Sequence, residues 1–283
     1  MGQLKKYMGE DGNFRAFVVE TGNVGRELYS RLQPYPIALR IITEAVTSGL
    51  LMASDLKVQG TISIKASGSG PLKHVTIEAN SQGEARGYCG DAHLQMEKKA
   101  GEALFFRAIG EGELTVRKRL VKSDKIYSSV VSLIPGGWAE NLTNYYQKSE
   151  QISSGMKLGV ELDPESGIKG AGGILIMAMP GADPEVLNQL ESNVGSIPPL
   201  GEIFSREDGQ DVVRDTLFKG LAVKHLETKN VLYRCNCSAS RVLAMLNSLG
   251  EKEIEDMKQK SEPLVVNCVF CSRSFKFQPE ELT

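Results

Sequence analysis

Cys235-Asn236-Cys237 and, roughly thirty residues later, Cys268-Val269-Phe270-Cys271 contain four of the five cysteines in the chain. Two cysteines separated by one or two residues can direct both sulfur atoms toward one point. Two such pairs supply the four thiolates of a tetrahedral zinc site, and all three histidines of the chain precede this segment. The spacing therefore predicts an all-cysteine zinc site with the ligands Cys235, Cys237, Cys268 and Cys271.

The same spacing also permits a thiol switch in which each pair closes into a local disulfide. A disulfide requires Cα atoms about 4.4–6.8 Å apart, and residues two apart in an extended chain lie near the upper end of that range. A bond between Cys235 and Cys237 is therefore expected to be strained and readily reduced. Arg234 would favour the thiolate form of the neighbouring pair. Zinc site and redox pair both remain open at this point.

Two further interpretations of the cysteines are simpler. The four thiols could be free and behave as small buried hydrophobic groups, although chance rarely produces two such close pairs. Cys89 lies far from the pairs in the sequence, at the end of an expected strand. We interpret Cys89 as a buried core thiol.

Residues 231–283 are expected to form a small C-terminal module around the cysteines. Ser238 can cap a helix from Ala239 to Leu249, which Gly250 would end. A module of this size has little hydrophobic core, and structural zinc contributes on the order of 10–16 kcal/mol of apparent folding free energy in small domains. Oxidation of the thiolates should therefore unfold the module.

Residues 181–230 are expected to form a linker of short helices. Asp183 followed by Pro184 is a good helix start, and further helical segments are expected at 200–204 and 212–218. Short helices are marginal unless they pack against something larger, so we expect this linker to be the least stable region. Loss of its packing partner would expose apolar helix faces.

Residues 1–180 are expected to form an α+β domain with a largely antiparallel sheet. Asp11-Gly12 between the apolar runs 4–8 and 14–20 predicts a hairpin, and a buried helix should begin at Pro36. Alternating segments predict further strands, and a short helix is expected at 139–149. We expect one strand pair at 103–109 and 113–117, and tight turns at 68–71 and 170–173, because neither glycine-rich segment fits the dinucleotide-binding pattern.

Composition excludes several classes of protein. The chain has 283 residues, 41% of them hydrophobic, and a formal net charge of −2, so no excess of Lys and Arg is available for nucleic-acid binding. No membrane span or signal segment is expected, which predicts a cytoplasmic protein with reduced cysteines. The histidines have no visible catalytic partner, so we expect no enzyme and assign no catalytic residue.

On these residues the chain resembles the 33 kDa chaperonin family, the redox-regulated heat-shock chaperones of bacteria. The resemblance covers essentially the whole chain. Its most specific parts are the two cysteine pairs, with Ser238 after the first and Phe275-Lys276-Phe277 after the second. The segments Gly70-Pro71, Arg86-Gly87-Tyr88 and Ala171-Gly172-Gly173 resemble parts of the N-terminal domain of that family.

The resemblance implies an α+β core domain at 1–180, a metastable linker at 181–230 and a redox-switch zinc domain at 231–283. It implies that the reduced form binds one zinc ion and is inactive. Peroxide or hypochlorite with heat would form the disulfides Cys235–Cys237 and Cys268–Cys271 and release zinc. The linker would then unfold, the chain would dimerise, and unfolding client proteins would be held without ATP. Cys89 departs from the family pattern.

Two alternatives to this hypothesis are kept. A constitutive zinc-ribbon module would bind a protein or nucleic-acid partner in its reduced, zinc-loaded form. A thiol oxidoreductase would need a CxxC motif at the start of a helix, whereas Cys268 follows an expected strand and Cys271 precedes another.

Overall fold

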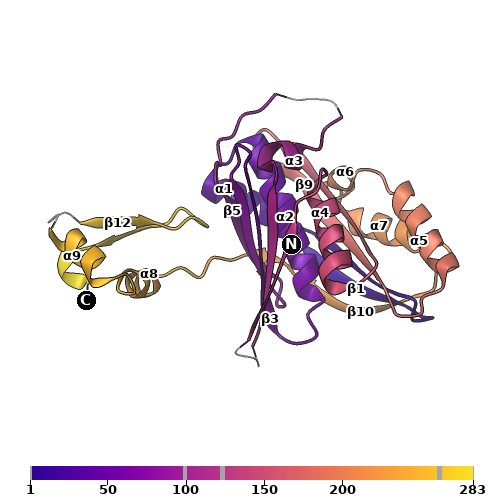
Figure 1. Cartoon of the computed structure of the whole chain (residues 1–283). Helices are drawn as coiled ribbons and strands as arrows, with labels where there is room; N and C mark the ends of the chain where they lie inside the picture. The colour runs from indigo at the N-terminus through magenta and orange to yellow at the C-terminus, as the bar shows by residue number, and fades with distance from the viewer. Residues whose placement is uncertain (1, 98–100, 122–124, 260–262, 283) are drawn as a thin grey trace. The chain divides into compact units, whose positions relative to one another are not determined.

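The computed structural model describes residues 2–97, 101–121, 125–259 and 263–282. The chain divides into two compact units, Met1–Tyr233 and Arg234–Thr283, which are described separately below. Figure 1 shows the order of the elements along the chain.

One helix, α2 (Pro36–Ser54), forms the centre of the first unit. Pro36 occupies its first turn, where the missing N–H group costs nothing, and nearly every residue from Ile41 onward is buried. The helix contacts strands of two different sheets and therefore lies between them. It is long and apolar enough to cross a membrane, but 83% of its most apolar window is buried inside the protein, as in a core helix.

The first sheet has five strands in the order β10-β1-β2-β9-β8, all antiparallel to their neighbours. The hairpin expected around the Asp11-Gly12 turn is confirmed as β1 and β2, and Gly12 adopts a φ of 77°. Its strands are β1 (Gln3–Gly9), β2 (Phe14–Glu20), β8 (Ser154–Asp163), β9 (Gly167–Ala178) and β10 (Val223–Asn230).

The second sheet has six strands in the order β11-β5-β4-β3-β6-β7. Only the pairing of β11 with β5 is parallel, so the expected α+β class with mainly antiparallel strands is confirmed. Its strands are β3 (Gly60–Gly68), β4 (His74–Asn80), β5 (Glu84–Cys89), β6 (Gly112–Leu120), β7 (Ile126–Ser132) and β11 (Leu232–Tyr233).

Two local predictions in the first unit are wrong. Residues 103–109 are not a strand but contain the helix α3 (Leu104–Ile109), because a short apolar run fits a buried helix as well as a strand. Residues 170–173 are not a turn but lie inside β9. Their glycines clear space for packing, since a Cβ atom on Gly172 would lie 2.3 Å from the Phe204 ring.

Two further helical segments of the first unit lie at residues 22–32 and 138–150. Residues 22–32, for which the sequence analysis makes no prediction, form α1. The helix expected at 139–149 is present, and its last turn is a π-helix. These elements are α1 (Gly22–Leu32), α4 (Trp138–Tyr145) and the π-helical turn Tyr146–Glu150.

Residues 181–233 fold with the first unit. Three short helices are present as expected, α5 (Pro184–Ser196), α6 (Leu200–Ile203) and α7 (Gly209–Leu217). They pack apolar side chains against strands β1, β2 and β9. Strand β10 was not predicted, because its charged residues hide the strand pattern; it pairs with β1 along its whole length.

The described residues of the C-terminal unit form two helices and one antiparallel strand pair; the helix after Ser238 and a strand on each side of the second cysteine motif were expected. Ser238 accepts a hydrogen bond from the backbone N–H of Arg241 at the start of the first helix. A small apolar cluster contains Leu246, Ile254, Phe277 and Leu282. The elements are α8 (Ala239–Leu246), α9 (Glu251–Gln259), β12 (Leu264–Asn267), β13 (Ser274–Phe277) and the 3-10 turn Pro279–Glu281.

Candidate metal centre

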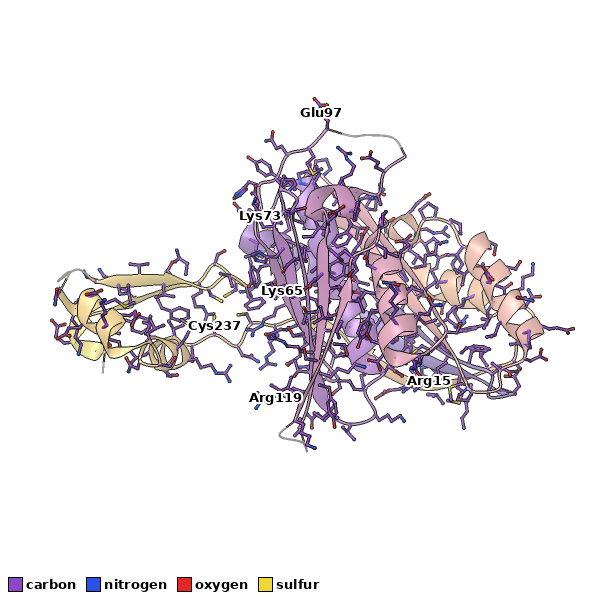
Figure 2. The ribbon with its side chains drawn as sticks, viewed as in Figure 1. Arg15, Lys65, Lys73, Glu97, Arg119 and Cys237 are labelled. Carbon is purple, nitrogen blue, oxygen red and sulfur yellow. The ribbon has the colours of Figure 1, made fainter. Side chains whose placement is uncertain are left out.

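The four paired cysteines meet at one point in the C-terminal unit. Their Sγ atoms all lie within 4.8 Å of one another, and no other group of three or more His, Cys, Asp or Glu side chains with metal-binding spacing occurs in the described part of the chain. Figure 2 labels Cys237 within this unit. The structure thus brings together all four cysteines that the sequence analysis singled out.

Two close sulfur contacts join the two motifs. Sγ of Cys235 lies 3.6 Å from Sγ of Cys268, and Sγ of Cys237 lies 3.4 Å from Sγ of Cys271. With metal–sulfur bonds of about 2.3 Å, sulfur atoms at the corners of a tetrahedron around zinc lie roughly 3.8 Å apart. The four thiols therefore match the size of a tetrahedral zinc site, and all are free cysteines.

The second motif is shaped by the turn between β12 and β13. The backbone N–H of Cys268 donates to the carbonyl of Arg273, and the N–H groups of Cys271 and Ser272 donate to the carbonyl of Cys268. Ser272 adopts a φ of 56°, which lets the chain reverse within this short turn. The turn thus holds the backbone that carries Cys268 and Cys271, whose Sγ atoms both belong to the cysteine group.

The first motif is held by the start of α8. The guanidinium of Arg241 donates a 2.7 Å hydrogen bond to the backbone carbonyl of Asn236, between the two cysteines. Arg234 Nε donates to the side-chain oxygen of Asn236 at 3.1 Å. The contact of Arg241 with the first motif was not predicted. Its position three residues after the N-cap Ser238 could have indicated a side chain that reaches back to the cysteines.

The ionisation of the thiols is strongly interdependent. Burial raises the pKa of Cys235, but hydrogen bonds from Cys237 and the other thiols outweigh this effect and lower the pKa to about 7. Burial and the neighbouring thiols raise the pKa of Cys237 to about 12 and also raise that of Cys268. One thiol thus loses its proton readily, and its negative charge disfavours ionisation of the neighbouring thiols. A bound divalent cation would offset the repulsion between the thiolates.

Cys89 and the histidines lie outside this group. Cys89 ends β5 and is half-buried rather than part of the core, and this partial burial raises the pKa of its thiol to about 12, which disfavours the reactive thiolate. His74 packs edge-on against Tyr88, and His225 packs against Tyr7 in the first unit. None of these residues belongs to the cysteine group.

Nearly the whole chain that contains this centre is similar in sequence to known proteins. Residues 2–278 match the family model described as Hsp33 protein. A protein named 33 kDa chaperonin from Desulforamulus reducens is 32% identical over 280 residues, which cover 99% of this chain and 95% of that protein. The 33 kDa chaperonin of a Geobacillus strain is 34% identical over 284 residues, with 99% and 95% coverage.

The fold shows the same relationship. The crystal structure of the 33 kDa chaperonin (heat shock protein 33 homolog) of Thermotoga maritima matches with a TM-score of 0.88 at 26% identity, and the match covers 99% of this chain and 95% of that one. Sequence and fold therefore agree over nearly the full length of the chain. The protein belongs to the Hsp33 family and is a chaperone rather than an enzyme.

Proposed function

We propose that this chaperone is a redox-regulated, ATP-independent holdase. Its reduced form binds one zinc ion through Cys235, Cys237, Cys268 and Cys271 and is inactive toward clients. The proposal rests on one observation, the convergence of four Sγ atoms within 4.8 Å from two separate motifs. Zinc, when bound there, supplies the metal–thiolate bonds that stabilise a unit whose apolar cluster is small.

Oxidation would remove the ligands of the metal. Formation of a Cys235–Cys237 disulfide takes two electrons from two thiolates, and hydrogen peroxide accepts them with two protons to give two water molecules. A second equivalent of peroxide oxidises Cys268 and Cys271 in the same way. No thiolate then remains to hold zinc, which leaves as Zn²⁺, and the C-terminal unit loses its main source of stability.

Residues 181–230 would act as the metastable linker between a core domain at 1–180 and a redox-switch domain at 231–283. The three helices are short, and α5 buries only Leu190 and Asn193 fully. Their apolar side chains cover strands of the first sheet, so unfolding of the helices would expose two apolar surfaces at once. Such surfaces bind the apolar segments that unfolding client proteins expose.

We further propose a cytoplasmic location and a homodimer in the oxidised state, without nucleic-acid or membrane partners. A reducing cytoplasm would keep the four thiols ready for zinc until an oxidant appears. The formal net charge of −2 disfavours binding to nucleic acid.

The decisive experiment compares reduced and peroxide-treated protein. Zinc release, free thiols and suppression of aggregation of a heated client are measured on the same samples. We expect about one zinc ion per chain to be released and holdase activity to appear only after oxidation. Equal activity before and after oxidation would contradict the switch, and retained zinc with binding in the reduced form would support the alternative, a constitutive zinc-ribbon module.

A further inference from the structure

Asn236, the residue between the first two cysteines, is held by arginines on both sides. Arg241 donates to its backbone carbonyl at 2.7 Å, and Arg234 donates to its side-chain oxygen at 3.1 Å. We propose that Arg241 is a positioning residue that holds Cys235 and Cys237 in the metal-binding arrangement and slows their rearrangement into a disulfide. This inference rests on the proposed function. It makes Arg241, which is not a metal ligand, a residue that controls the rate of oxidation.

The anchor for this contact is the first turn of α8. The backbone N–H of Arg241 donates to the Ser238 hydroxyl at 3.3 Å, and the N–H of Val242 donates to the Ser238 carbonyl at 3.0 Å. The backbone of Arg241 is therefore fixed by the helix cap, while its side chain reaches back to Asn236. A guanidinium that donates to a carbonyl forms a charge-assisted hydrogen bond, which is stronger than a neutral one.

The sulfur geometry explains why this contact would control oxidation. Cys235 and Cys237 each make a close sulfur contact with the other motif, at 3.6 Å to Cys268 and 3.4 Å to Cys271. A bond within the first pair requires the two sulfur atoms to leave these contacts and approach to about 2.05 Å with a defined dihedral angle, and the Cys235–Cys237 loop would rearrange to allow it. The carbonyl of Asn236 lies in the middle of that loop, so this change breaks the bond from Arg241.

The test compares Arg241→Gln with Lys252→Gln, which removes one positive charge from an exposed position on α9 of the same unit. Zinc affinity of the reduced full-length chain is measured by competition with a chromogenic chelator. The rate of zinc release in peroxide is measured separately. Loss of one hydrogen bond at an exposed arginine should weaken zinc binding and speed its release by roughly three- to tenfold, with Lys252→Gln unchanged.

Arg241→Lys separates the roles of charge and contact. It keeps the positive charge but lacks the planar guanidinium, so a partial rescue relative to Arg241→Gln is expected if a cationic donor at this position holds the loop. Helical content from circular dichroism shows whether each zinc-loaded variant is folded. If Arg241→Gln does not fold, the same two measurements on Arg241→Lys test the proposal.

Two results would overturn the inference. One is an Arg241→Gln variant with the zinc affinity and release rate of Lys252→Gln. The other is slower release of zinc in the variant than in the wild type. Failure of the proposed function is distinguishable, because wild-type protein would then keep its zinc in peroxide, while the affinity measurement on reduced protein would still report whether Arg241 positions the loop.

Discussion

The Sγ atoms of Cys237 and Cys271 lie 3.4 Å apart although 34 residues separate them in the chain. Cys235 and Cys268 form the second such contact, at 3.6 Å. In this arrangement each motif contributes one sulfur atom to each close contact. Disulfide formation within each motif would therefore have to break both of these contacts.

Replacement of a single cysteine ligand should abolish tight zinc binding. Cys271 is buried, and Cys271→Ser leaves three thiolates around the site. Because loss of an outer partner of a ligand alone costs roughly 10–100-fold in metal affinity, loss of a ligand should cost more than about 100-fold. Zinc content and chelator competition measure the effect. Cys89→Ser is the matched control and should retain one zinc ion per chain; loss of zinc in both variants would contradict the assignment.

Removal of zinc from reduced protein should unfold the C-terminal unit while the second sheet of the first unit stays folded. Structural zinc contributes on the order of 10–16 kcal/mol in small domains, more than the apolar cluster around Leu246 and Phe277 can replace. Hydrogen exchange after chelation should accelerate in α8, α9, β12 and β13, while β3 and β4 of the first unit stay protected. Added zinc should restore protection. Unchanged exchange in the C-terminal unit would show that its fold does not depend on metal.

A buried apolar residue in α7 tests the stability of the linker helices. Leu217 is fully buried against the first sheet, and Leu217→Ala should destabilise the packed helices by about 2–5 kcal/mol. Hydrogen exchange in α5 and α7 should accelerate, and less oxidant or heat should be needed for holdase activity. Leu226→Ala on β10, where the side chain is 41% exposed, is the control and should change little. Equal effects of both substitutions would contradict a separately unfolding helical segment.

Glu44 should make the stability of the first unit depend on pH. It lines a cavity of about 300 Å³ with Arg40, Trp138 and Glu140. Burial raises the pKa of Glu44 to about 7, Arg40 opposes the shift, and Glu140 adds to it. Because the folded-state pKa exceeds the usual value of 4.5, stability from this group is complete below about pH 4.5 and is lost as pH rises through about 7.

Glu44→Gln removes this titration while preserving the size of the side chain. We expect the variant to be more stable than wild type at pH 8 by about 1–3 kcal/mol, with a smaller difference at pH 5. Urea unfolding followed by fluorescence of the single tryptophan, Trp138, measures both values. Glu161→Gln on β8 serves as a control. A pH-independent difference between Glu44→Gln and wild type would rule out the titration.

Much of the fold followed from local sequence patterns. The hairpin of β1 and β2, the core helix that begins at Pro36 and the capped helix after Ser238 were all predicted, because turn residues, caps and periodicity act over a few residues. The helix α3 was mistaken for a strand because a short apolar run has no period of its own. Strand β10 was missed because its charged side chains conceal its pairing with β1.

The sequence by itself predicted the chemistry of the candidate centre, since the spacing of the four cysteines suits an all-sulfur ligand set and permits a local redox pair. Only the tertiary structure decided that Cys235 faces Cys268 and Cys237 faces Cys271, that Arg241 holds Asn236, and that residues 181–233 fold with the first unit. The physical reason is the separation along the chain of the residues that interact. Spacing and capping depend on neighbours along the chain, whereas these contacts depend on which distant surfaces pack together.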